Sequence, residues 1–343
     1  MAREPKREPK LEPMREPMRE AKLEPKRELK REPKGSAAWR DAEEWLRRGG
    51  ISRWETMVPL SEYTTWKIGG PARIMAWPEK EEDFSGLARF CADNDYPVRI
   101  LGLGSNILAA DEGVDAIVIH TGRLNRIEWE TKASANADTG VSAGAGTPLG
   151  ALVEESIQRG AEGLEFAAGI PGSLGGAVIM NAGAFGGQMS DILHSVTVMG
   201  FDGIPRTLKK DEIRFGYRES GLKEKVFAVM SARMRLRPGD KESVRSKARD
   251  YISRRAGTQP LEYPSGGSVF KNPEGQGAGR YIDQAGLKGV RAGKAQISEK
   301  HANFIINLGG AKAADVLTLM ELMARETKER FGVSLESEVV YWD

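Results

Sequence analysis

The sequence predicts a protein of mixed helices and strands that folds into more than one domain. The chain has 343 residues, beyond the length at which a single hydrophobic core usually stops growing. Short β-rich runs alternate with stretches of amphipathic helical spacing along most of it. Glycine is abundant, at 40 residues, which favours tight turns and close backbone approaches over a helical bundle.

The composition excludes several classes of protein. Hydrophobic residues make up 40% and charged residues 29%, which is typical of a soluble globular protein. The formal net charge of +2 is too small to indicate a nucleic-acid or membrane partner. No apolar run approaches the roughly 18 residues needed to span a bilayer, and the charged start from Arg3 is unlike a secretory signal. A single cysteine, Cys91, leaves no internal disulfide, so we expect a cytoplasmic protein.

Residues 1–35 form a repeat with a period of four in which glutamate recurs and proline usually follows it. They contain twelve Lys or Arg against eight Glu, a net charge of +4, so the remaining chain carries −2. Proline at this spacing removes helical N–H donors, and there is little apolar surface to bury. We therefore expect a disordered tail. A solvated tail is the favoured interpretation, and a weak anchor for an anionic partner or lipid surface is the alternative.

Three structured parts are expected after the tail. Residues 39–48 have the pattern of an amphipathic helix, and residues 59–71 that of a loop. The first part, 50–115, contains a small β-α-β unit. The second part, 116–240, is rich in short strands, and the third, 241–343, begins and nearly ends with a helix. The expected strands are 72–77, 98–103, 116–119, 126–129, 141–145, 195–199, 227–236, 304–307 and 338–342, and the helices are 79–93, 148–159, 241–255 and 313–331.

A glycine-rich turn follows the expected strand 98–103. It carries Gly102, Gly104, Ser105 and Asn106, but the third glycine of a G-x-G-x-x-G pattern is missing, so the ordinary Rossmann interpretation fails. Such a turn exposes successive backbone N–H groups, which suits a pyrophosphate. A plain turn at the end of a strand is the alternative.

A second run of small residues spans 169–184. It cannot build a core of its own, and it lets a planar or anionic ligand lie against the backbone. A flexible linker is the alternative, but apolar residues are interleaved through this run and linkers are usually polar throughout. The candidate cofactor-binding residues here are Gly169, Ile170, Gly172, Ser173, Gly175, Asn181 and Gly183.

An ordered set of motifs gives a specific resemblance. The chain resembles the UDP-N-acetylenolpyruvoylglucosamine reductase family over roughly residues 50–343. The short path between Arg235 and Ser268 is similar to the second type of that family, which lacks an extra substrate-covering loop. The motifs are YTTWKIGGPA (63–72), GLGSN (102–106), GIPGS (169–173), FGYRES (215–220), GGSVFKNP (266–273), GRYIDQAGLKG (279–289), HANFIIN (301–307) and LESEV (335–339).

The resemblance implies a fold, a cofactor and a reaction. The fold is α+β, with an FAD-binding domain of the vanillyl-alcohol-oxidase (PCMH) type over residues 50–240 and a substrate-binding domain over 241–343. The reaction is NADPH-dependent, FAD-mediated reduction of UDP-N-acetylglucosamine enolpyruvate to UDP-N-acetylmuramate, a step of peptidoglycan precursor synthesis. No cysteine or histidine lies within the glycine-rich stretches, so we expect noncovalent FAD. We also expect a monomer with no nucleic-acid partner.

The resemblance also implies catalytic roles for three residues. Arg218, Ser268 and Glu338 stand at the positions of the family's arginine, serine and glutamate. Negative charge builds on the substrate carboxylate as hydride arrives, so the site needs a cation, a hydrogen-bonding acid and a proton donor. We expect Glu338 to have a raised pKa. Taken singly, each residue has an ordinary structural interpretation as a strand arginine, a turn serine or an edge-strand charge.

Seven further polar residues are candidates for contacts with the substrate, because basic and amide groups suit a diphosphate. A structural role for Asn303 or Gln284 is an equal alternative. The histidines His120 and His194 lack metal-ligand spacing, so no metal is expected, and Cys91 is expected in a core. The rival functions are a flavin oxidase of the same superfamily and a non-catalytic binder of nucleotide sugars or nucleic acid. The candidates are Tyr217, Lys271, Asn272, Arg280, Gln284, His301 and Asn303.

Overall fold

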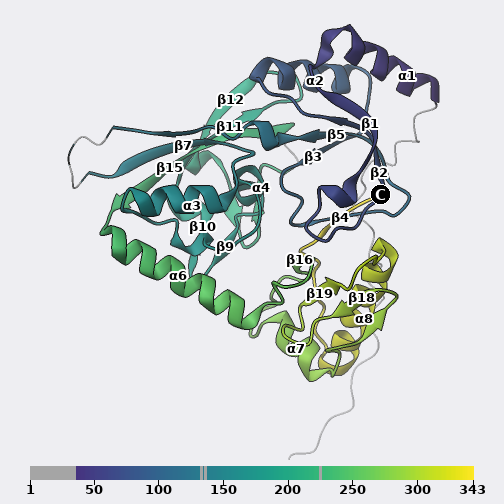
Figure 1. Cartoon of the computed structure of the whole chain (residues 1–343), viewed down its shortest axis with the longest axis vertical. Helices are drawn as coiled ribbons and strands as arrows, with labels where there is room; N and C mark the ends of the chain where they lie inside the picture. The colour runs from purple at the N-terminus through teal and green to yellow at the C-terminus, as the bar shows by residue number, and fades with distance from the viewer. Residues whose placement is uncertain (1–35, 132–133, 135–136, 224–225) are drawn as a thin grey trace, which may run out of the picture. The chain divides into compact units, whose positions relative to one another are not determined.

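The computed structural model describes residues 36–131, 134, 137–223 and 226–343 (Figure 1). The tail predicted over residues 1–35 lies outside the described residues. Within the described part of the chain, none of the helices combines the length and the apolar character that crossing a membrane requires.

The first sheet has four strands in the order β1-β2-β5-β3. β2 (Pro71–Ala76) and β3 (Val98–Leu101) both pair in parallel with β5 (Val114–His120), which lies between them. Helix α2 (Glu81–Asp93) connects β2 to β3, so the predicted β-α-β unit is confirmed, with a third strand inserted. The sequence analysis did not predict β1 (Trp54–Pro59), which is the antiparallel edge strand.

One hydrophobic core contains residues of the first sheet, of helix α2 and of the helix that precedes β1. The predicted helix over residues 39–48 is confirmed as α1 (Ser36–Trp45), which is followed by one π-helical turn, Leu46–Gly50. Trp39 and Leu46 are each 1% exposed and pack in this core. Cys91 also packs there, as predicted, and burial raises the pKa of its thiol to about 12.

The second sheet is antiparallel, and four of its six strands, β6, β7, β11 and β15, were predicted, whereas β8 and β12 were not. Its order is β12-β11-β15-β7-β6, with the short β8 also pairing with β15. Helix α3 (Leu149–Gln158) packs beside β8 and against α6 (Lys241–Thr258). The strands are β6 (Ile127–Trp129), β7 (Thr139–Gly144), β8 (Ala161–Glu162), β11 (Leu193–Met199), β12 (Pro205–Lys209) and β15 (Ala228–Pro238).

The glycine-rich run after residue 168 contains a helix that the sequence analysis missed. α4 (Leu174–Ile179) includes adjacent glycines, which lower helix propensity by about 1 kcal/mol each relative to alanine. Tertiary contacts override this cost. The backbone N–H of Gly175 donates to the carbonyl of Ala145 at 2.8 Å, and a Cβ added at Gly175 would lie 2.9 Å from the Cβ of Ala145. Glycine therefore lets this helix approach β7 closely.

Two short hairpins and a one-turn helix follow α4. They are β9 (Gly183–Ala184) with β10 (Gly187–Gln188), then α5 (Met189–Ile192), and further along the chain β13 (Phe215–Gly216) with β14 (Glu219–Ser220). The second hairpin carries the catalytic candidate Arg218 in its turn.

The third sheet is antiparallel, with the order β16-β19-β18-β17. The predicted strand over residues 304–307 is confirmed as β19 (Phe304–Asn307), and the predicted helix over residues 313–331 is confirmed as α8 (Ala313–Phe331). The sequence analysis missed α7 (Ala278–Gln284), which lies in a glycine-rich stretch and packs against α8. The remaining strands are β16 (Ser265–Ser268), β17 (Arg291–Ala292) and β18 (Ala295–Ile297).

The last strand returns to the first part of the chain. β20 (Val340–Trp342) pairs in parallel with β4 (Ile107–Ala109), and Val340 is opposite Ile107 (Figure 1). We expected this strand to belong to residues 241–343 alone. The pairing brings the residues just before β20 beside the glycine-rich turn at 102–106.

Candidate active site

The two glycine-rich segments lie against each other. A Cβ added at Gly102 would collide with Oγ of Ser173, and one added at Gly172 would lie 3.0 Å from Oγ of Ser105. Gly104 has φ +62°, and a Cβ there would collide with the carbonyl oxygen of Tyr63. Residues far apart in the sequence thus form one small-residue surface.

This surface offers unused hydrogen-bond donors. None of the backbone N–H groups of residues 102–106 donates to another described residue, and the same holds for Gly172 and Ser173. Neighbouring N–H groups do have partners, since Leu174 donates to the carbonyl of Thr147 at 2.8 Å. A run of free N–H groups forms an anion-binding concavity. The residues therefore fit the diphosphate of a dinucleotide such as FAD.

The other cofactor candidates have different surroundings. Ile170 packs against the hydrophobic core of the second sheet. Gly169 has φ +73°, and a Cβ added there would lie 3.2 Å from Cδ of Arg255. The side chain of Asn181 makes hydrogen bonds within the protein: Nδ2 donates to the carbonyl of Gly216 at 3.0 Å, and Oδ1 accepts from the N–H of Ser190 at 3.0 Å. The backbone N–H of Asn181 is also engaged, because it donates to the carbonyl of Val178 at 3.2 Å.

Arg218 projects from the turn of the β13–β14 hairpin. Its φ of +58° lies in the left-handed region, which is strained for a residue with a side chain. Nε lies 3.0 Å from Oε1 of Glu338, and Nη2 donates to the carbonyl of Gly183 at 2.8 Å. The guanidinium also lies over the Tyr217 ring, 5.1 Å from its centroid. These contacts hold the arginine and leave part of its fork free.

Glu338 is held by backbone hydrogen bonds on both sides. Its N–H donates to the carbonyl of Val269 at 2.9 Å, and its carbonyl accepts from Nδ2 of Asn106 at 2.8 Å. Burial raises the pKa of the Glu338 carboxyl above its ordinary value, although the charges of Arg218 and Lys271 partly offset it. The direction of the shift agrees with the expectation from sequence.

Ser268 ends strand β16, directly before Val269, whose carbonyl holds Glu338. Its side chain is half-buried, and Oγ makes no hydrogen bond with the described residues. The preceding Gly267 has φ +80°, and a Cβ there would meet no atom within 4 Å. The serine therefore ends its strand with a hydroxyl that no described residue engages.

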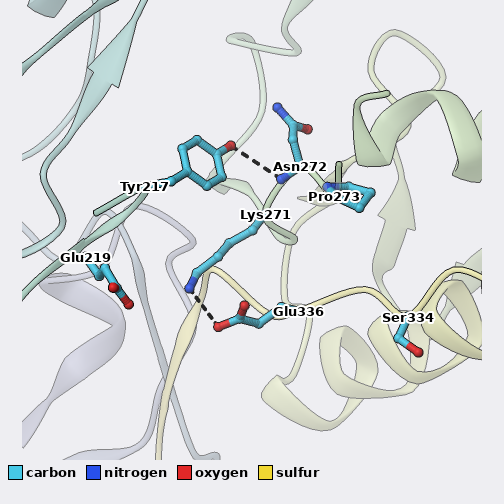
Figure 2. A pocket seen from close by; sticks show the side chains of 7 residues that line it. All are labelled: Tyr217, Glu219, Lys271, Asn272, Pro273, Ser334 and Glu336. Carbon is cyan, nitrogen blue, oxygen red and sulfur yellow. Dashed lines mark hydrogen bonds and ion pairs between the residues drawn. The ribbon is translucent and has the colours of Figure 1, made fainter. Parts of the chain in front are cut away.

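A pocket beside the Arg218 hairpin collects three of the substrate candidates (Figure 2). The hydroxyl of Tyr217 accepts from the N–H of Asn272 at 3.4 Å. Nζ of Lys271 donates to Oε1 of Glu336 at 2.7 Å. Tyr217 is 50% exposed, so its ring is open to a ligand. The pocket is lined by Tyr217, Glu219, Lys271, Asn272, Pro273, Ser334 and Glu336.

The other four substrate candidates lie outside this pocket lining. Asn303 is 2% exposed, and its side chain bonds both the N–H and the carbonyl of Phe270, at 3.1 and 2.8 Å, so it has a structural role. His301 packs edge-on against Phe304, and burial lowers its pKa. Arg280 and Gln284 are exposed on α7.

Two residues around the site, Glu336 and Arg255, received no role from the sequence, and a third, Asn106, makes a contact that was not expected. Glu336, which pairs with Lys271, was part of the LESEV motif but received no role. It precedes Glu338 by two residues in an extended segment, a spacing that places alternate side chains on one face. The side chain of Asn106 was expected at the cofactor and instead holds the backbone of Glu338. Nothing in the sequence pointed to Arg255.

Comparison with known proteins places the fold. The family described as "FAD binding domain" matches residues 72–208, and the C-terminal domain of UDP-N-acetylenolpyruvoylglucosamine reductase matches residues 259–342. The crystal structure of the reductase from Thermus caldophilus has 40% sequence identity and a TM-score of 0.72, covering 85% of this chain and 99% of that one.

Relatives with the same name are similar to this chain over most of its length. The UDP-N-acetylenolpyruvoylglucosamine reductase of Heliobacterium modesticaldum is 44% identical over 298 residues, covering 86% of this chain and 92% of the relative. The second such reductase of Symbiobacterium thermophilum is 45% identical over 285 residues, covering 83% and 90%.

The family matches and the fold define an FAD-binding oxidoreductase of the α+β class, which agrees with the predicted fold class. Within that class, the chain belongs to the UDP-N-acetylenolpyruvoylglucosamine reductase family.

Proposed function

We propose that this protein reduces UDP-N-acetylglucosamine enolpyruvate to UDP-N-acetylmuramate, with NADPH as reductant and noncovalent FAD as carrier, in the cytoplasmic synthesis of peptidoglycan precursors. One observation carries the proposal most directly. The Arg218–Glu338 pair has an Nε–Oε1 distance of 3.0 Å, and the N–H of Glu338 donates to the carbonyl of Val269, the residue that follows Ser268. Cation, acid and hydroxyl are the three groups that reduction of an enolpyruvyl ether requires.

Bound FAD would accept hydride from NADPH and deliver it to the terminal vinyl carbon of the enolpyruvyl group. Arg218 would bind the carboxylate of that group. Two of its five N–H groups are engaged by Glu338 and the Gly183 carbonyl, so three remain for the substrate. A planar fork suits a carboxylate and holds it in one orientation.

Glu338 would stabilise the enolate that develops from this carboxylate. A neutral carboxyl can donate a hydrogen bond to an oxygen that gains negative charge, whereas an ionised one would repel it. Burial favours the neutral form, since it raises the pKa of Glu338. The ordinary structural interpretation of this residue, an edge-strand charge, does not account for its burial.

Ser268 would give its hydroxyl proton to the alpha carbon. The ordinary pKa of a hydroxyl is far too high for free donation, so the transfer is coupled to the basicity of the enolate. The hydroxyl has no competing partner among the described residues, and the glycine before it leaves open space at this point of the strand.

The diphosphate and sugar would extend into the pocket beside the hairpin. Tyr217 and Lys271 offer a hydroxyl and a cation there, whereas Oδ1 of the neighbouring Asn272 accepts from the N–H of Ala278 at 3.1 Å. Lys271 is paired with Glu336, which is 73% exposed, so a diphosphate can replace that carboxylate without burying it unpaired. Arg280, Gln284 and His301 remain candidates for the more distant groups.

The test is NADPH oxidation by purified protein with and without the enolpyruvyl sugar nucleotide. We expect one NADPH to be oxidised for each sugar nucleotide reduced, and no oxidation when the sugar nucleotide is left out. Acid treatment should release all the flavin into solution. Arg218→Met should reduce turnover by at least about a hundredfold, as the loss of one transition-state donor does. Arg214→Met, four residues earlier and exposed, is the matched control. Oxidation that depends on O₂ instead of the sugar nucleotide would indicate the rival flavin oxidase.

A further inference from the structure

A second arginine lies at the reacting end of the site, on the helix that leads into the substrate domain. Arg255 stands in the last turn of α6. Its side-chain stem lies on the second glycine-rich segment, because a Cβ added at Gly169 would be 3.2 Å from Cδ and 3.3 Å from Nε of Arg255. The arginine therefore lies close to the start of the second glycine-rich segment, three residues before Gly172.

The guanidinium of Arg255 lacks the partners that a buried arginine ordinarily has. Nε is buried and makes no hydrogen bond within the described part of the chain. Arg255 also forms no ion pair with an acid among those residues. A buried N–H without an acceptor costs about 1–3 kcal/mol, so such groups usually have a ligand or water as partner.

The positive charge of Arg255 and its neighbour Arg218 also favours binding of an anion. Burial and the neighbouring charge of Arg218 both lower the pKa of Arg255, and no carboxylate acts in the other direction. Glu338, the one acid paired with Arg218, is itself inclined to be neutral because of burial. Arg255 thus lies near a second cation without a carboxylate of its own, and this balance favours a ligand that carries or gains negative charge.

A second unpartnered group lies one helical turn further along. Gln259 donates its N–H to the carbonyl of Arg255 at 2.8 Å, and its side-chain Oε1 is buried without a partner in the described residues. The end of α6 therefore offers a charged donor and a neutral acceptor. A pyrimidine edge, in which a carbonyl oxygen lies next to an N–H, is complementary to such a pair.

Two ligands of the proposed function carry this edge: the flavin ring and the uracil of the sugar nucleotide. Uracil is separated from the enolpyruvyl group by a diphosphate and a sugar, whereas Arg255 lies next to Arg218 and on Gly169. From this placement we infer that Arg255 binds the pyrimidine edge of the flavin and balances the negative charge that the edge gains on reduction. The inference rests on the proposed function only in requiring FAD.

The test is the midpoint potential of the bound flavin, measured by anaerobic dye equilibration of the FAD-loaded full chain, with neither NADPH nor sugar nucleotide. Arg255→Met should weaken stabilisation of the reduced flavin at least tenfold, a shift of about 30 mV to more negative potential for two electrons. Arg255→Lys keeps the charge and should shift the potential less. Arg254→Met is the matched control, because Arg254 is exposed and paired with Asp250 at 2.9 Å.

Three outcomes would overturn the inference. An unchanged potential in Arg255→Met with lower thermal stability would make the arginine structural. An unchanged potential with weaker binding of uridine diphosphate would move Arg255 to the uracil. Equal shifts in Arg255→Met and Arg254→Met would indicate a diffuse effect of net charge. If Arg255→Met does not fold with FAD, the midpoint potential of Arg255→Lys is compared with that of the wild type. Lysine keeps the charge but lacks the Nε–H donor, so the potential should still shift, and an unchanged potential would overturn the inference. A failed turnover assay would leave this measurement intact.

Discussion

Ser268 is the residue whose two interpretations differ most in what they predict. As a proton donor it acts only on the enolpyruvyl substrate, because reduction of the flavin by NADPH needs no proton from it. As a structural turn residue it would affect both half-reactions and stability together. Its hydroxyl has no partner among the described residues, which favours the first interpretation.

We therefore expect Ser268→Ala to separate the half-reactions. Stopped-flow absorbance should show near-normal bleaching of the flavin by NADPH. Reoxidation by the enolpyruvyl substrate should slow by about 10² to 10⁴, the usual effect of losing one positioned proton donor. Reoxidation at the wild-type rate would mean that another group supplies the proton.

The buried carboxyl of Glu338 predicts a pH dependence. Its folded-state pKa is raised, so the neutral form dominates below that pKa and is lost as the pH rises through it. Reoxidation of the flavin by the sugar nucleotide should accordingly fall on the alkaline side, above the ordinary carboxyl pKa. In Glu338→Gln the fall of the reoxidation rate at alkaline pH should disappear, and the rate should be lower than that of the wild type at every pH. An identical limb in wild type and Glu338→Gln would assign the titration to another group.

At the level of elements, the turn over residues 102–106 works through its backbone. A side chain at Gly102 would collide with Oγ of Ser173, so the two glycine-rich segments would separate and their free N–H groups would no longer face one ligand. The glycine is needed at this close approach and not for the strand that precedes it.

Gly102→Ala should therefore lose FAD while the protein stays folded. We expect at least a tenfold weaker affinity, measured by flavin fluorescence, with far-UV circular dichroism unchanged. Gly150→Ala is the control, since a Cβ at this exposed position of α3 meets nothing within 4 Å. That variant should keep its flavin and gain up to about 1 kcal/mol in the free energy of unfolding. Equal flavin affinity in both variants would contradict the proposed cradle.

Periodicity predicted the long elements well and the glycine-rich ones poorly. The helix at 313–331 and the strand at 304–307 have the predicted bounds, because their apolar spacing is regular. Helices α4 and α7 were missed, since their low intrinsic propensity is offset by contacts that only the fold supplies. The same limit applies to Arg255, whose surroundings depend on a distant glycine.

At the level of the whole molecule, the last strand crosses the boundary expected between the first and third parts of the chain. β20 leaves the third part of the chain and pairs with β4 of the first, and this pairing places Glu338 beside Asn106. Motif order identified Glu338 from the sequence, but the strand's partner could not be read from its alternation. The divisions at residues 115 and 240 remain a proposal about how the chain is organised.

The repeat over residues 1–35 lies outside both matched family domains, which span residues 72–208 and 259–342. Deleting it should leave kcat/KM within about a factor of two, because its charged, proline-punctuated composition offers little to a folded site. Steady-state assays of the full and shortened chains at equal flavin content make the comparison. A tenfold loss with normal thermal stability would make the tail part of the working enzyme.

The central claim is that the reduced flavin of this protein passes its electrons to UDP-N-acetylglucosamine enolpyruvate. It is tested most directly by a single anaerobic turnover. The FAD-loaded protein is photoreduced without NADPH, mixed with the sugar nucleotide and followed at the flavin absorbance. The account predicts full recovery of the oxidised spectrum and one equivalent of a product two hydrogens heavier than the substrate. A flavin that stays reduced until oxygen is admitted would contradict it.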